Sequence, residues 1–253
     1  MNLSAVILTK NEEANIEACI QSIRFADEIV VIDDYSDDKT TEIAERYGVK
    51  VFKRHLGDDF AKQRNYGLDK ALCKWALFVD ADERITAKLK EEIIEKTKSS
   101  NKTGYYLTRR DHFFGKILKY GEFCVYGPFG NQKLLRLANK GAGKWIRAVH
   151  EHWEIRGNIG LLKFPLLHFP HQTIKEFVDH INYFSTIHAG EIIREKKQPS
   201  LLKVILWPIF KFIYNSVFRL GLLDGQEGFI AIMMMSFHSF LAWSKVWVIK
   251  NQN

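Results

Sequence analysis

Apolar runs and polar turns alternate in a regular order along the first hundred residues. Short runs rich in β-branched residues predict buried strands at Leu3–Thr9, Glu28–Asp33, Val49–Lys53 and Trp75–Val79. Stretches with helical spacing predict helices at residues 16–23, 41–47, 60–72 and 86–98. Continuously hydrophobic strands that alternate with helices are typical of a parallel sheet covered on both faces. We therefore expect a doubly wound α/β unit over residues 1–98.

The pattern changes after residue 98. Residues 99–172 mix aromatic, glycine and basic side chains, and short strand candidates at Gly104–Arg109, Lys133–Leu137 and Gly160–Phe164 are expected to extend the same sheet. Residues 173–253 are predicted to be helical, with an amphipathic helix followed by two strongly apolar segments. The chain thus divides into three successive regions.

The last apolar segment, Phe229–Ile249, has 21 residues and as a helix would be about 31 Å long, just enough to cross a bilayer. Polar side chains such as Lys245 would be costly at that depth. The earlier segment, Leu201–Tyr214, is shorter and contains Pro208. We favour helices that lie in a membrane interface with tryptophans such as Trp207 at headgroup level. Mutual burial in a core or in a homodimer interface is the alternative.

Composition narrows the class of protein. The chain has 253 residues, 46% of them hydrophobic, which excludes intrinsic disorder and suits one large domain with an appendage. Its three cysteines are far apart and form no CxxC pair, which argues against a disulfide framework and a structural zinc site. The N-terminus lacks the pattern of a secretory signal and is expected to be a folded strand.

The formal net charge of +7 is distributed unevenly. Residues 1–100 hold 16 basic and 20 acidic side chains, residues 101–172 hold 12 and 4, and residues 173–253 hold 9 and 6. The basic excess therefore belongs to the second half of the chain. Because no RNA- or DNA-binding pattern accompanies it, we expect no nucleic-acid partner.

Carboxylates follow two of the predicted strands. Asp80 and Asp82 come at the end of the fourth strand, where hard oxygen ligands suit Mg²⁺ or Mn²⁺ bridged to phosphate. An acidic turn is the alternative interpretation. Asp33 ends the second strand, where an acid commonly accepts hydrogen bonds from ribose hydroxyls or a base N–H. The neighbouring Asp38 is expected to cap the next helix.

Two further polar residues in the same half have alternative roles. Asn11, in the turn after the first strand, is either a ligand contact or a helix N-cap. Arg64, in the sequence QRN, is either a diphosphate ligand or a solvated or sheet-capping helical side chain.

The order and spacing of these segments resemble the inverting glycosyltransferases of family 2. The resemblance rests on the runs AVILTKNEEANIEACIQSI, EIVVIDDYSDDKT, AKQRNYGL and WALFVDADERIT. It implies a GT-A nucleotide-diphospho-sugar transferase fold, a Rossmann-like and mostly parallel sheet. It also implies that Asp33 contacts uracil or ribose. By the same resemblance, the DxD acids Asp80 and Asp82 bind ribose and the diphosphate-bound metal. The nucleotide pocket would be lined by Thr9, Asn11 and Glu12.

The second half resembles the lipopolysaccharide-core glucosyltransferases within that family. The similar runs are RRDHFFGKILKYG, QKLLRL, VHEHWEIRG, PLLHFPHQTIKEFVDHINYFST and LGLLDGQEGFIAIMMMSFHSFLAWSKVW. The subgroup usually has an Asp before QLRL, whereas this chain has Gly130 and Asn131 there. The resemblance therefore implies no role for an acid at that point in this chain.

Inverting transfer requires a general base for the acceptor hydroxyl. Residues 101–172 contain only four acids, and Glu151 stands in VHEH where the family pattern keeps His-Glu. We expect Glu151 to be the base and His150 its orienting or metal-proximal neighbour; a surface strand with a structural pair is the alternative. His168 and His171 are expected to make structural hydrogen bonds rather than to bind metal.

Together these observations predict a transferase that moves a hexose, glucose by the subgroup resemblance, from a nucleotide-diphosphate sugar such as a UDP-hexose to a lipid-linked or lipopolysaccharide-core glycan. Residues 1–98 would bind the donor, residues 99–172 the acceptor, and residues 173–253 the cytoplasmic face of the inner membrane, peripherally or monotopically. A nucleotidyltransferase is one alternative, although LTKNEEAN lacks the expected glycine-rich loop. A membrane adaptor that binds nucleotide sugar without turnover is another.

Overall fold

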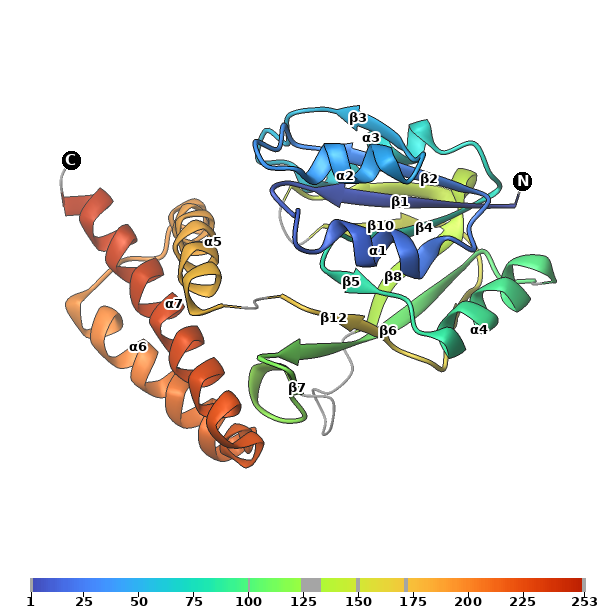
Figure 1. The fold of residues 1–253 in the computed structure, drawn as a ribbon. Coiled ribbons are helices and arrows are strands. Elements are labelled where there is room, and N and C mark those ends of the chain that lie inside the picture. Colours follow the sequence, from blue (N-terminus) through green and yellow to red (C-terminus); the bar gives the residue numbers. More distant parts are fainter. Residues whose placement is uncertain (1, 100, 124–132, 149–150, 171–172, 252–253) are drawn as a thin grey trace. The chain divides into compact units, whose positions relative to one another are not determined.

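The computed structural model of the chain describes residues 2–99, 101–123, 133–148, 151–170 and 173–251. These residues form two compact units (Figure 1). The first holds residues 2–109 and 133–168, and the second holds residues 110–123, 169–170 and 173–251. The boundaries expected from function, at residues 98 and 172, divide the chain differently and stay a prediction.

A parallel sheet forms the centre of the first unit. Strand β1 (Leu3–Thr9) lies between β2 (Glu28–Asp33) and β4 (Trp75–Asp80), and β3 (Lys50–Lys53) lies beyond β2; all four are parallel. The apolar runs form strands because they can be buried on both faces of the sheet. The predicted α/β fold is confirmed.

The residues that follow extend this sheet in mixed orientation. Strand β8 (Lys133–Asn139) pairs antiparallel with β4, and β6 (Gly104–Phe113) pairs antiparallel with β8. Short strands complete the order β3-β2-β1-β4-β8-β6-β12-β5 among the described residues. They are β12 (Leu166–His168) and β5 (Glu83–Arg84); β11 (Ile159–Leu161) pairs with β6 outside this order.

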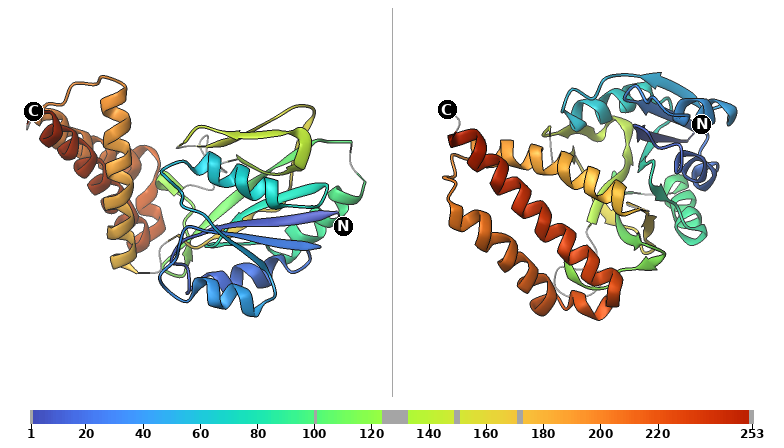
Figure 2. Two further views of the ribbon diagram at one scale, coloured as in Figure 1. Left: turned by 90° about the horizontal axis from the view of Figure 1, so that it is seen from above. Right: turned by 60° about the vertical axis from the view of Figure 1, so that its left-hand side comes forward.

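Side chains alternate between the two faces of the sheet, so each face has its own core. Helices α1 (Ile16–Ile23), α2 (Thr40–Arg46) and α4 (Ala87–Lys98) cover one face. Helix α3 (Phe60–Lys70) and a hairpin of β9 (Gly143–Ile146) and β10 (His152–Ile155) cover the other (Figure 2). The sequence did not predict this hairpin; it offered only a surface strand beside Glu151 as an alternative.

The second unit is mainly helical. It contains α5 (Ile174–Arg194), α6 (Leu201–Ile213) and α7 (Gly225–Asn251), and α7 lies between the other two (Figure 2). The Thr173 and Ser200 hydroxyls accept hydrogen bonds from the first turns of α5 and α6. A π-helical turn (η3, Tyr214–Phe218) and a 3₁₀ turn (η4, Gly221–Asp224) connect α6 to α7.

The motif LGLLDGQEG forms the joint between α6 and α7. Its Gly221 and Gly228 pack so closely that a Cβ on Gly228 would lie 2.2 Å from the Gly221 carbonyl oxygen. The buried Asp224 carboxylate accepts backbone N–H bonds from Lys119 and Tyr120, each at 2.8 Å. Asp224 therefore fastens the loop after β7 (Lys116–Ile117) to the helical joint.

Candidate active site

The carboxyl ends of the parallel strands bring three of the predicted residues to one edge. Thr9 is paired in register with Asp33 across β1 and β2, and Leu8 is paired with Asp80 across β1 and β4. Ligands bind at this edge in open α/β sheets because polar groups and backbone ends converge there. Thr9 Oγ1 is buried without a hydrogen-bond partner.

The loop after β1 is fastened to the loop after β2. Asn11 has a positive φ of 55°, its N–H donates to Ser36 Oγ at 2.9 Å, and its Oδ1 accepts the Asp37 N–H at 3.0 Å. The Glu12 N–H donates to Thr40 Oγ1 at 2.7 Å. Asn11 is therefore not the N-cap of α1, which begins at Ile16; its polar groups hold two site loops together.

Asp33 is fully buried, and its carboxylate accepts both the N–H and the hydroxyl of Ser36. Asp34 is more exposed and pairs with Lys10 at 3.0 Å. Burial opposes ionisation of Asp34, but the Leu56 N–H and Lys10 outweigh it and lower its pKa. Asp33 thus fixes the conformation of the loop after β2, and the Asp34 carboxylate adds negative charge beside that loop.

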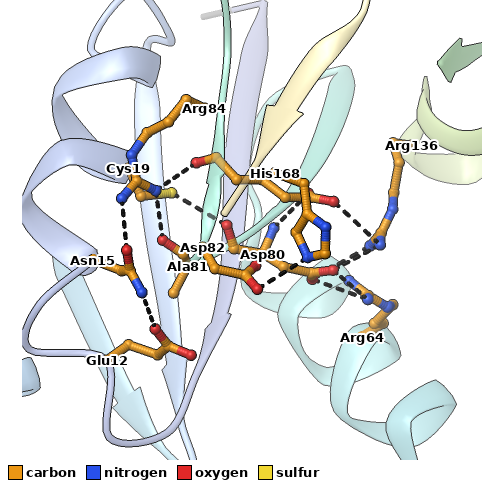
Figure 3. A network of polar contacts seen from close by, with 11 residues as sticks. Glu12, Asn15, Cys19, Arg64, Asp80, Ala81, Asp82, Arg84, Arg136 and His168 are labelled. Atoms are coloured by element: carbon orange, nitrogen blue, oxygen red, sulfur yellow. Dashed lines mark hydrogen bonds and ion pairs between the residues drawn. The ribbon is translucent and has the colours of Figure 1, made fainter. Parts of the chain in front are cut away.

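Two arginines hold Asp80. Arg136, from β8, lies 2.7 Å from Asp80 Oδ2, and Arg64, from α3, lies 3.0 Å from Asp80 Oδ1 (Figure 3). Burial disfavours the charged carboxylate, but Arg136 and Arg64 outweigh burial and hold its pKa well below the ordinary value. Asp80 is therefore ionised at every physiological pH, and its oxygens are already paired.

Asp82 has a different partner. His168, at the end of β12, places Nε2 3.0 Å from Asp82 Oδ2 (Figure 3). Burial disfavours the charged form of Asp82, but His168 outweighs burial and lowers its pKa. Asp82 lies in the turn between β4 and β5, beyond the strand, so the two DxD carboxylates have separate partners rather than one shared set.

The neighbours of the DxD acids fix this turn. Glu83 Oε2 accepts the Asp80 N–H at 2.9 Å, and burial together with the Asp80 charge raises the pKa of Glu83. Arg84 donates to Ala81 O at 2.8 Å and to Asn15 Oδ1 at 3.1 Å. Through Asn15, which donates to Glu12, the turn is joined to the loop after β1 (Figure 3).

Glu151 reaches the same cluster from the β9–β10 hairpin. Its Oε1 lies 2.9 Å from Arg64 Nε, so one guanidinium contacts both Glu151 and Asp80. Arg64 also lies over the Trp145 ring, 4.8 Å from its centroid, and its third nitrogen is buried without a partner. Arg64 is therefore an organising residue and not a solvated one. His150 and His171 lie outside the described residues.

Arg136 and the pairing of His168 were missed from the sequence. A charged residue within the apolar run LLRL is a usable signal for Arg136, because a buried arginine needs an acidic partner. No local pattern marks His168 as the partner of Asp82.

The donor chemistry of the site suits a divalent cation. Asp82 and His168 offer one carboxylate oxygen and one imidazole nitrogen side by side, and diphosphate oxygens and water commonly supply the remaining ligands. Arg64 and Arg136 pair with Asp80, Arg64 also pairs with Glu151, and Asp82 pairs with His168. No cluster of three or more His, Cys, Asp or Glu side chains suited to a metal occurs in the part of the chain that the structure describes.

This fold and this edge define the class of nucleotide-sugar transferases. The profile described as glycosyl transferase family 2 matches residues 4–140. A lipopolysaccharide core biosynthesis glycosyltransferase, LpsC of Rhizobium meliloti, is 31% identical over 97% of this chain and 92% of its own length. The chain belongs to glycosyl transferase family 2 and is a glycosyltransferase.

A second relative and a solved structure are also similar to this chain. A glycosyltransferase of Rickettsia bellii is 29% identical over 96% of this chain and 85% of its own length. The crystal structure of TarS 1-349 from S. aureus shares 14% identity and a TM-score of 0.50 over 97% of this chain and 92% of that chain, and so shares the fold.

The second unit has two helical segments long and apolar enough to cross a membrane, Leu201–Phe218 and Gly221–Asn251. Of their most apolar windows, 17% and 39% of the residues are buried, respectively. These segments are compatible with membrane association.

Proposed function

We propose that this glycosyltransferase moves a hexose, with glucose as the first candidate, from a nucleotide-diphosphate sugar to a hydroxyl of a lipid-linked or lipopolysaccharide-core glycan, with inversion at the anomeric carbon. The observation that carries the proposal is the convergence of Asp82, His168, Asp80, Arg64 and Glu151 at the carboxyl edge of the sheet. The relationship to LpsC, named for lipopolysaccharide core biosynthesis, supports the acceptor class.

Asp82 would hold Mg²⁺ or Mn²⁺ on the donor diphosphate. His168, expected from the sequence to make only structural hydrogen bonds, is now proposed as a second ligand because its Nε2 lies 3.0 Å from Asp82 Oδ2. A carboxylate suits both ions, whereas an imidazole is a better ligand for Mn²⁺ than for Mg²⁺. The ion, when bound, would neutralise charge on the leaving diphosphate. Arg136 and Arg64 would keep Asp80 in place for contact with ribose, and the unpaired third nitrogen of Arg64 is available to a diphosphate oxygen.

The nucleoside would lie along the loops after β1 and β2. Thr9, Asn11 and Glu12 would contact it from one loop and Asp33 from the other. Thr9 Oγ1 is buried without a partner, which suits a bound hydroxyl or phosphate. Because both Asp33 oxygens accept from Ser36, Asp33 would reach uracil or ribose only by sharing one of them.

Glu151 would act as the general base. As the bond from the acceptor oxygen to the anomeric carbon forms, the acceptor proton passes to Glu151 and the bond to the diphosphate breaks. Arg64 fixes one oxygen of Glu151 by a 2.9 Å contact, which orients the carboxylate before the acceptor arrives. His150, its neighbour in sequence, remains the proposed orienting or metal-proximal residue.

Family membership makes a nucleotidyltransferase the weaker alternative, because the matched family transfers sugars. An adaptor that binds nucleotide sugar without turnover remains a distinct hypothesis. Membrane association is proposed to be at the cytoplasmic face of the inner membrane, peripheral or monotopic, with the apolar helices of the second unit as the contact. A homodimer stays a prediction.

A panel of nucleotide sugars, each with Mn²⁺ or Mg²⁺ and a core-glycan acceptor, tests the proposal. We expect acceptor-dependent release of nucleoside diphosphate from a UDP-hexose. Binding of the donor without release in the presence of acceptor would support the adaptor instead. Release of pyrophosphate from a nucleoside triphosphate would support nucleotidyl transfer.

A further inference from the structure

Exposed apolar side chains are concentrated in α6, α7 and the joint between them. Of the 26 exposed large hydrophobic side chains among the described residues, 20 lie between Leu201 and Ile249. Soluble monomers rarely expose contiguous apolar patches larger than a few hundred Å². In α6 these side chains recur at Leu202, Leu206, Ile209 and Phe210 and leave only one side of the helix, at Val204, for packing.

The side of α7 that α5 covers packs through apolar residues such as Ala231 and Ala242, and it also includes one charged residue, Lys245. Lys245 Nζ donates to the Asn182 carbonyl at 2.6 Å, to Ser185 Oγ at 2.8 Å and to Thr186 Oγ1 at 2.7 Å. Ser239, two turns earlier on α7, is also buried. The sequence of α7 looks uniformly apolar, but the fold packs it against α5 and α6 and leaves Phe229, Met233, Phe237 and Phe240 exposed.

Helix α5 cannot follow α7 into a hydrocarbon layer. Its exposed side carries Lys175, Glu176, Asp179 and Arg194. Each charge at bilayer depth costs several kcal/mol, and α5 packs along α7 (Figure 2). A transmembrane α7 would therefore have to leave α5 and break the bonds of Lys245.

Both ends of α7 are also fastened to polar segments. At the N-terminal end, Lys116 lies 3.2 Å from Glu227, and Asp224 holds the backbone of the loop after β7. At the C-terminal end, Lys250 donates to the Lys197 carbonyl at 3.2 Å. A helix of 27 residues is about 40 Å long. If α7 crossed a bilayer, one of these polar ends would have to pass through the hydrocarbon layer.

We propose that α6 and the outward face of α7 lie in the plane of a single leaflet of an anionic membrane, embedded at the boundary between headgroups and acyl chains, and that neither helix crosses it. This inference develops the membrane association proposed above and does not depend on the transfer chemistry. Residues 196–253 hold seven basic and two acidic side chains, which attracts anionic lipid. The same charge would repel a second copy brought face to face by a two-fold axis.

The first experiment determines the topology. Cysteines are introduced singly in the full chain at opposite ends of α7, as Gln226→Cys and Asn251→Cys, both at exposed positions. The protein is added to the outside of preformed vesicles that contain phosphatidylglycerol and is labelled with a membrane-impermeant maleimide, with the unsubstituted chain as the background control. We expect both positions to be labelled from outside to a similar extent. Labelling of only one position until the vesicles are lysed would overturn the proposal.

The second experiment determines whether the exposed helices bind a membrane or a second copy of the chain. Leu206→Glu with Phe210→Glu changes two side chains that are 54% and 56% exposed, and Leu161→Glu is the matched control at a site that is 50% exposed in the first unit. We expect the double variant to lower partitioning onto vesicles with phosphatidylglycerol by about tenfold or more, the control to leave it unchanged, and vesicles of phosphatidylcholine alone to bind more weakly. No vesicle binding by the unsubstituted chain, or a dimer in solution that only the double variant dissociates, would overturn the proposal.

Donor binding in vesicle-free solution is measured for the same proteins. Retained donor binding with lost vesicle binding in the double variant attributes the loss to the helices and leaves the proposed transfer function intact. Lost turnover with retained vesicle binding, in contrast, would count against the transfer function alone.

Discussion

His168 Nε2 lies 3.0 Å from Asp82 Oδ2, although the two residues belong to the end of β12 and the turn after β4. The pair gives the second DxD acid an imidazole neighbour that the motif itself does not contain. We consider the Asp82–His168 pair the proposed binding site of the divalent ion. The pair also separates the role of Asp82 from that of Asp80, which is bound by two arginines.

The first prediction concerns this pair. Asp82→Asn and His168→Ala should each weaken Mn²⁺-dependent binding of a nucleotide diphosphate and lower turnover by about 10²-fold or more, because each removes one of two proposed protein ligands. Calorimetry with and without Mn²⁺ measures the binding. His180→Ala, at an exposed histidine of α5, is the control. Metal-dependent binding that is unchanged in both variants would refute the assignment.

The second prediction concerns Glu151. Glu151→Gln should preserve donor binding and lower transfer by about 10²- to 10⁴-fold, because the amide cannot accept the acceptor proton. Glu154→Gln, three residues later and exposed on β10, should behave like the unsubstituted enzyme. Measurements of kcat and of donor Kd separate the two effects. A rate near normal in the Glu151 variant would show that another group is the base.

The third prediction concerns Arg136. Arg136→Met should destabilise the first unit by about 1–3 kcal/mol, because it leaves the partly exposed Asp80 carboxylate with one guanidinium partner instead of two. Arg136→Lys should recover part of the stability but less of the donor affinity, since an ammonium cannot reproduce the geometry of the guanidinium. Urea denaturation and donor titration measure these outcomes. If both variants bound the donor as tightly as the unsubstituted enzyme, the position of Asp80 would not matter for the nucleotide.

The fourth prediction concerns pH and stability. Burial opposes the charge on Glu28, but Lys50, Ser4 and the Leu72 N–H outweigh it and lower its pKa. A lowered folded-state pKa means that the stabilisation is present above the unfolded-state value and is lost as the pH falls through the folded-state value. Glu28→Gln should therefore cost about 1–2 kcal/mol at pH 7, with the difference from the unsubstituted chain shrinking below about pH 4.5.

Denaturation of both proteins from pH 7 to pH 3 measures this convergence. Glu42→Gln is the control, because Glu42 is exposed and forms only a surface pair with Arg46. A difference that stays constant over the whole range would show that the Glu28 charge does not contribute.

Much of the first unit was predictable because its signals are local. The runs AVIL and IVVI are apolar along their whole length, which only burial on both faces of a sheet satisfies, and the parallel order of β1, β2 and β4 follows from the helices between them. The hairpin of β9 and β10 was not predicted, because its strands have four residues each and its apolar side chains, Trp145 and Trp153, pack on Phe78 from a distant strand.

The same contrast holds for the helical unit. The apolar composition of α7 is visible in the sequence. How the one charge within its apolar stretch, Lys245, is satisfied depends on α5, which supplies the hydrogen-bond partners. The joint motif LGLLDGQEG could be recognised as a similarity but not explained, because its Asp224 acts on a loop about a hundred residues earlier.

The sequence by itself determined the α/β class, the family resemblance, and the placement of Asp33, Asp80 and Asp82 at strand ends, because strand burial and strand termini are encoded within a few residues. Only the tertiary structure decided the partners of those acids. Arg136 and Asp80 are 56 residues apart, and Arg64 and Glu151 are 87 residues apart. Such pairs form because the sheet order brings β8, β12 and the β9–β10 hairpin to the edge where β4 ends, and a buried charge is stable there only with its opposite beside it.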